Sequence, residues 1–144
     1  MSDNDAPLPA VLAQRDAIVK LEQALHAQPD RLEARDFVTR HHFAPGSYAR
    51  EIELPAGSLV VGKIHRHAHV NVVSAGRCVV ATEDGTEEFV APCTFVSKAG
   101  TKRAVDALED TVWTTIHVTN ETDLERIEAE IIAPTFAALE EKGV

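Results

Sequence analysis

Three histidines, His65, His67 and His69, occupy alternate positions in one short segment of the chain. Side chains of a β-strand alternate between its two faces, so an extended segment would place all three imidazoles on one face. Neutral imidazole is a common metal ligand, and ligands on one rigid strand need little rearrangement to meet an ion. We therefore predict a metal site here. The alternative is a row of solvated or hydrogen-bonded histidines, because the other face of the segment is mostly apolar and the pattern does not say which face is inside.

His117 is the fourth candidate ligand. It shares a predicted strand face with Trp113 and Thr115, and it would complete three or four nitrogen ligands if its strand lay beside the first. Such a site suits a divalent transition metal, here Zn, Fe, Mn or Ni, and ligand type also allows Cu. Three ligands with an open position would permit catalysis, whereas a closed set of four would be structural. Alone, His117 would be read as a buried histidine with its hydrogen bonds satisfied.

Two adjacent histidines, His41 and His42, form a separate group. Only one of them can face the interior of a strand, and the matching parity of Phe37 and Phe43 favours His41. Neither is included in the predicted ligand set.

Other polar residues are weaker candidates. Glu51 and Glu53 share one strand face and could offer a carboxylate, but an exposed face is expected. Tyr48 and Glu53 are weak candidates for a general base, and neither is assigned that role. Lys102 and Arg103 are expected to form a solvated pair, with contact to an anion as the alternative.

The composition is that of one globular domain. The chain has 144 residues, of which 44% are hydrophobic and 26% charged. A net charge of −9 argues against nucleic-acid binding. No apolar run reaches the roughly 20 residues that span a membrane, and the acidic N-terminal segment does not resemble a signal peptide. Cys78 and Cys93 form no CxxC pair, so we expect reduced thiols and a cytoplasmic location. Neither cysteine has a histidine nearby in the sequence, so no thiol nucleophile is assigned.

The middle of the chain reads as strands. Short segments rich in β-branched residues are separated by turn signals such as Asp84-Gly85 and Ala99-Gly100. No helical pattern interrupts them, so we predict an antiparallel sandwich or barrel. The predicted strands lie near residues 37–43, 47–54, 58–65, 67–73, 77–82, 86–90, 93–97, 103–108 and 111–118.

A helix is predicted on each side of the strands. From about residue 10 to 27, Val11, Ile18, Leu21 and Leu25 form an apolar stripe beside a column of alanines. We predict that this stripe packs on the domain itself, and a subunit contact through the alanine column is the alternative. The helix should stop at residues 28–30.

The C-terminal helix begins at a predicted capping box, residues 122–125, with Asp123 favourable to the helix dipole. Its buried stripe is predicted to comprise Leu124, Ile127, Ile131 and Ile132. Pro134 should break or kink it. The chain would thus divide into a tail and amphipathic helix (1–35, the first seven residues loose), a barrel (36–120) and a C-terminal helix packed on the barrel (121–144).

Two segments resemble the motifs of the cupin, or RmlC-like, superfamily, whose fold is an antiparallel double-stranded β-helix, or jelly-roll barrel. The first cupin motif carries an HxH pair and a glutamate between glycines, and it resembles the segment from Gly62 to Gly76, with His65 and His67 as the pair. The glutamate position falls on or near Asn71.

The second cupin motif resembles the segment from Ala91-Pro92 through Gly100 to Arg103. Arg103 stands where the family places a histidine ligand. Two of the four usual ligands of the family are therefore absent, which counts against ordinary cupin metal catalysis.

Four stretches are similar to small cupin-like proteins encoded by tailed phages, over about residues 36–132. They are residues 40–46, 62–65, 92–103 and 109–117. This resemblance implies a place in the virion or the host cytoplasm, with other phage structural proteins as partners and the terminal helices as docking elements.

Three functions are compatible with these features. The first is a non-catalytic assembly module that forms a symmetric homo-oligomer, with the histidines holding a structural ion or filling a polar centre. The second is a metal-dependent oxygenase, isomerase or lyase acting on a small substrate. The third is a metal-free module that binds a small molecule in the barrel mouth. We favour the first, with the enzyme as the alternative.

Overall fold

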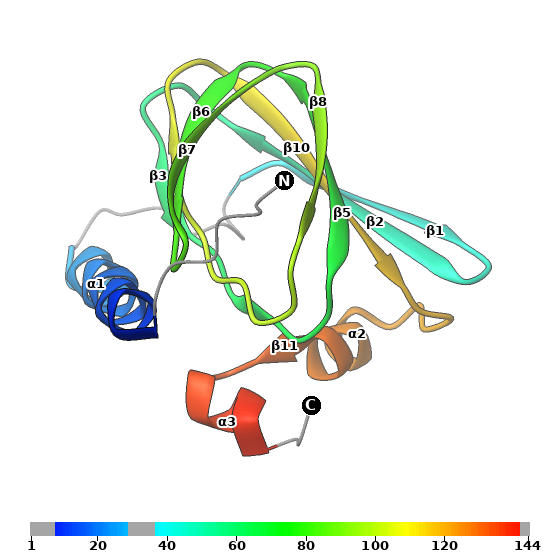
Figure 1. The fold of residues 1–144 in the computed structure, drawn as a ribbon. Helices are drawn as coiled ribbons and strands as arrows, with labels where there is room; N and C mark the ends of the chain where they lie inside the picture. The colour runs from blue at the N-terminus through cyan, green and yellow to red at the C-terminus, as the bar shows by residue number, and fades with distance from the viewer. Residues whose placement is uncertain (1–7, 29–36, 142–144) are drawn as a thin grey trace.

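A computed structural model of the chain describes residues 8–28 and 37–141 (Figure 1). The predicted loose tail, the helix stop at residues 29–30 and the domain boundary at 35/36 lie outside these ranges. Where the structure describes the chain, no helix is long and apolar enough to cross a membrane.

Eleven strands and three helices are assigned to the described residues. The helices are α1 (Leu8–His26), α2 (Leu124–Ile131) and α3 (Phe136–Glu141). The strands are β1 (Thr39–Ala44), β2 (Ser47–Leu54), β3 (Leu59–Val61), β4 (Ile64–His65), β5 (His69–Ala75), β6 (Arg77–Thr82), β7 (Gly85–Val90), β8 (Cys93–Ser97), β9 (Ala104–Ala107), β10 (Thr111–Val118) and β11 (Ile132–Ala133).

The strands form an antiparallel barrel. One sheet has the order β1-β2-β10-β5-β8, the other has β3-β9-β6-β7, and β4 pairs with β11 in a third, two-stranded sheet. Figure 1 shows the two large sheets facing each other, with the β1–β2 hairpin extending away from them. The predicted antiparallel barrel with helices on either side is confirmed.

The three histidines do not share one extended strand, which the predicted metal site required, although the predicted strands 58–65 and 67–73 already placed a break between them. Strand β4 ends at His65, a bend follows, and β5 begins at His69. The backbone N–H of Arg66 donates to the carbonyl of Ile131 at 2.7 Å, and β4 pairs with β11 instead of continuing into β5. A contact between distant parts of the chain thus overrides the local β pattern.

Helix α1 packs on the four-stranded sheet beside β3 and β6. Ile18 is buried, and Val11, Leu21 and Leu25 are partly buried, so the stripe covers its own domain as predicted. Two ion pairs fix the helix, Arg15 with Glu83 at 2.6 Å and Glu22 with Lys102 at 3.0 Å.

The start of α2 differs from the prediction by one residue. Asp123 is the N-cap, and its carboxylate accepts the backbone N–H of Glu125 at 3.0 Å. Ile127 and Ile131 are buried as predicted, but Leu124 is 44% exposed. Asp123 and Thr122 are both suitable N-cap residues, and in this structure Asp123 takes that role.

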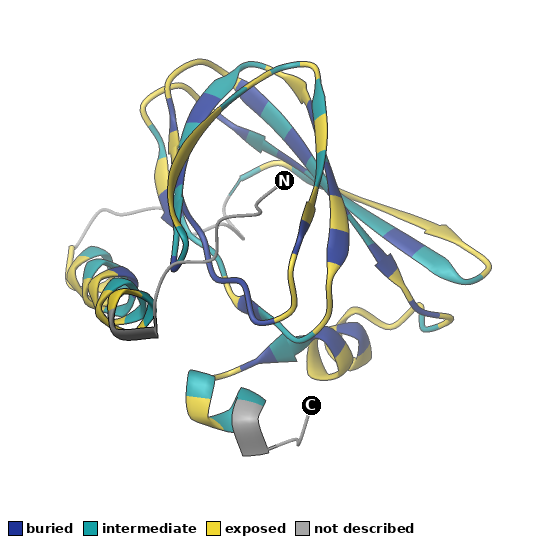
Figure 2. Ribbon diagram, in the orientation of Figure 1, coloured by how far each residue is buried: buried dark blue, intermediate teal, exposed yellow. Residues whose placement is uncertain are grey.

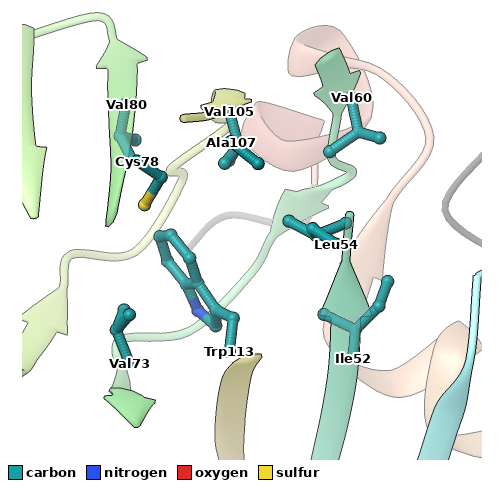
Figure 3. Packing of buried hydrophobic residues seen from close by; sticks show 9 residues of the cluster. All are labelled: Ile52, Leu54, Val60, Val73, Cys78, Val80, Val105, Ala107 and Trp113. Carbon is teal, nitrogen blue, oxygen red and sulfur yellow. The ribbon is translucent and has the colours of Figure 1, made fainter. Parts of the chain in front are cut away.

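The hydrophobic core fills one end of the barrel. Trp113 lies at its centre, with aliphatic side chains and Cys78 around it (Figure 3). Figure 2 shows buried and exposed residues alternating along the strands. A second, smaller cluster joins Tyr48 to Ile127 and Ile131 of α2, so α2 packs against the barrel at Tyr48.

Candidate functional site

The polar side chains of the interior gather beside this core. His65, His69 and His117 form a cluster in which the ring centroids of His65 and His69 lie 4.4 Å apart, those of His69 and His117 5.0 Å, and those of His65 and His117 5.5 Å. We call these three residues the histidine cluster.

Three separate elements position the histidine cluster. His69 begins β5, and His117 lies near the end of β10, which pairs with β5. His65 is held through its backbone, because its N–H donates to Thr101 at 3.1 Å and its carbonyl accepts the N–H of Gly100 at 2.7 Å. The two histidine-bearing segments are therefore neighbours, as the sequence required for a shared site.

His67 lies outside the histidine cluster. Its side chain is exposed in the bend between β4 and β5. Its carbonyl oxygen lies 3.2 Å from Nδ1 of His69, so that ring nitrogen donates to it. His69 then carries its proton on Nδ1 and presents a bare Nε2, which lies 3.4 Å from Nη1 of Arg103.

Burial, and after it the charge of Arg103, lowers the pKa of every member of the histidine cluster. The pKa falls to about 2 for His65 and to about 4 for both His69 and His117. All three rings are therefore neutral at physiological pH. Nδ1 of His65 is buried and has no hydrogen-bond partner within the described structure.

Arg103 is the feature that sequence reasoning missed. Instead of forming a solvated pair, Lys102 and Arg103 are both buried. Lys102 reaches Glu22 on α1, whereas the guanidinium of Arg103 donates to Oγ of Ser97 at 2.7 Å and lies 4.9 Å from the centre of the Trp113 ring. No local pattern distinguishes this buried arginine from an exposed one.

Asn71 links the histidine cluster to the hydrophobic core. It is fully buried, donates to Oγ of Ser97 at 2.9 Å and accepts the indole N–H of Trp113 at 3.0 Å. Strand alternation places Asn71 on the face of His69 and Val73, so this position could have been found from the sequence.

Tyr48 connects the histidine cluster to the outer hairpin. Its hydroxyl lies 2.7 Å from Nδ1 of His41, and its ring stacks on His117 with centroids 6.1 Å apart. His42, in contrast, binds the carboxylate of Glu51 at 2.9 Å. Glu51 and Glu53 both pair with Arg40, away from the histidine cluster.

The histidine cluster does not fit a metal ion as it stands. Among the residues that the structure describes, no group of three histidine, cysteine or acidic side chains is arranged to hold one. The rings of His65 and His117 are nearly parallel, at 9°, and Nε2 of His69 faces the Arg103 cation. The unpartnered Nδ1 of His65 and the neutral state of the three rings are the features that favour a metal.

A surface pocket of about 450 Å³ lies between α1, β4 and α2. Its lining includes Ile64 and Lys102, the chain neighbours of His65 and Arg103, but no member of the histidine cluster. Two ion pairs border it, Lys63 with Glu128 and Lys102 with Glu22.

Comparison with solved structures identifies the fold. Ectoine synthase from P. lautus is similar over 79% of this chain and 86% of its own, with a TM-score of 0.56 and 12% identity. The fold is that of the cupins. KdgF from Halomonas sp. matches 60% of this chain and 82% of its own (TM-score 0.51, 19% identity), and a cupin superfamily protein from Desulfitobacterium hafniense DCB-2 matches 61% and 82% (TM-score 0.50, 10% identity). The sequence matches no family model and no curated protein.

Proposed function

We propose that this cupin-fold chain is a non-catalytic assembly module that forms a symmetric homo-oligomer. The supporting observation is the outward face of the five-stranded sheet. We call it the valine face and define it as Ala49, Val70, Val72, Val96, Ile116 and Val118. The register aligns Val96, Val70, Ile116 and Ala49 in one row across four strands.

The valine face has the composition of an interface core. Val118 is 90% exposed, Val96 65% and Val70 38%. The charges beside it lie on β1 and β2, where Arg40 pairs with Glu51 and Glu53. An apolar centre with a paired, charged rim suits a contact with a second copy across a two-fold axis.

Solution mass, measured by light scattering, tests this proposal. The native chain should be a dimer or a larger even-numbered oligomer, and Val96→Lys should shift it toward monomer. Val90→Lys is the matched control, because Val90 is 57% exposed on β7 of the other sheet. A monomeric native chain, or equal effects of both variants, would refute the valine face as the contact.

The N-terminal helix offers a second contact. The alanine column Ala10, Ala17 and Ala24 is exposed, so a subunit contact through it stays a prediction. Ala17→Arg would dissociate an oligomer held through α1 and leave one held through the valine face intact.

The virion setting and the phage partners rest on the sequence resemblance alone, as does the host-cytoplasm location. A metal-dependent enzyme is the alternative, favoured by three neutral imidazoles in one cluster. Stoichiometric metal in the native protein that is lost in His65→Ala/His117→Ala would support that enzyme or a structural ion.

A further inference from the structure

Arg103 is a buried cation without a buried anion. Only 9% of the residue is exposed, and its hydrogen-bond partners in the described structure are the neutral groups Ser97 and His69. Within the described ranges no carboxylate pairs with its guanidinium. Buried charges in proteins are normally paired, because removing an ion from water is costly. The positive charge of Arg103 therefore has no neutralising negative group among the described residues of the barrel interior.

The groups around Arg103 reinforce this imbalance. The guanidinium of Arg50 also acts on His117, lowering its pKa. Nδ1 of His65 is buried and unpartnered within the described structure. The inward-facing residues of β2, β5, β8 and β10 include no acidic side chain. This region therefore offers cationic and neutral donors to a negative group and would repel a divalent cation.

We propose that the interior binds a small oxyanion, a carboxylate or a phosphate, directly on Arg103 without a metal ion. The planar guanidinium donates parallel hydrogen bonds to such oxyanions, and a neutral imidazole of the histidine cluster can donate one N–H. The role of Arg103 is electrostatic, and no bond is made or broken. This inference is independent of the valine face.

Trp113 provides the reporter for this site. It is the only tryptophan of the chain, and the Arg103 guanidinium lies 4.9 Å from its ring centre. We would titrate chelator-treated native protein with phosphate and, separately, with acetate, at constant ionic strength maintained with chloride. Saturable change of Trp113 fluorescence with either anion is expected. Response to phosphate alone identifies a phosphate site, and response to acetate alone identifies a carboxylate site.

The variant Arg103→Gln should weaken the response at least tenfold. The matched control is Arg77→Gln, which removes a half-exposed arginine that pairs with Glu88 at 2.8 Å. A response that is absent for both anions, unchanged in Arg103→Gln or dependent on added Zn²⁺ would overturn the proposal. If Arg103→Gln fails to fold, the NMR signal of the Arg103 Nε–Hε group in the native protein is followed during the titration instead. That resonance must shift saturably with the anion, and a resonance that does not move refutes the site.

Discussion

At the scale of single residues, the polar part of the interior consists of the three neutral imidazoles of the histidine cluster next to the buried guanidinium of Arg103. The ring centroids of the histidine cluster lie 4.4 to 5.5 Å apart, and Nε2 of His69 lies 3.4 Å from Nη1 of Arg103.

Stability should fall with acidification because the histidine cluster is held neutral. An unfolded histidine titrates near 6.5, whereas in the folded chain the pKa of His69 and of His117 is about 4. The unfolded state therefore binds more protons between these values, and the free energy of unfolding decreases as the pH falls from about 6.5 to about 4. Urea unfolding across this range measures it. A pH dependence no weaker in His117→Gln than in the native chain would contradict the assignment, and His42→Gln, at an exposed site, serves as the control.

Asn71→Ala should lower the free energy of unfolding by about 2–3 kcal/mol. The change leaves the indole N–H of Trp113 without its acceptor and removes one of the two donors to the Ser97 hydroxyl, which keeps its hydrogen bond from Arg103. Urea denaturation compared with Asn120→Ala, an exposed position, provides the test. Equal stabilities of the two variants would show that the Asn71 contacts contribute little.

At the scale of elements, local patterns predicted most of the molecule. Strand alternation located β2, β6, β8 and β10, because side-chain period depends only on neighbouring residues. A break near residue 66 was predicted from the strands at 58–65 and 67–73, but the pairing of β4 with β11 was not, since the two strands are more than 60 residues apart. The burial of Arg103 has the same origin, because packing between distant elements decides which basic residue lies inside.

Mutation can show whether Asp123 or Thr122 is the N-cap of α2. Asp123→Ala should lower the free energy of unfolding by about 1 kcal/mol, because the carboxylate of Asp123 accepts the N–H of Glu125. Thr122→Ala should lower the free energy of unfolding much less, since the side chain of Thr122 does not cap the helix in this structure. Thermal unfolding of both variants decides between the observed cap and the predicted capping box, and the opposite ranking would restore Thr122 as the cap.

At the scale of the whole molecule, the five-stranded sheet of the cupin fold has two faces of different composition. The inward face carries His69, His117 and part of the core, with His65 on the separate strand β4, and the outward face carries the valine face. The sequence resemblance implied this fold, and the positions that correspond to the family's glutamate and histidine ligands are occupied by Asn71 and Arg103 in this chain. Asn71 binds Trp113 and Ser97, and Arg103 supplies a positive charge.

Native mass spectrometry of the full chain, purified without chelator, tests the central claim in one spectrum. An assembly module should appear as an even-numbered oligomer whose mass is that of the polypeptide alone, apart from a bound oxyanion. A monomer carrying one transition-metal ion per chain would contradict both the assembly role and the reading of Arg103, and would favour a metal-dependent enzyme.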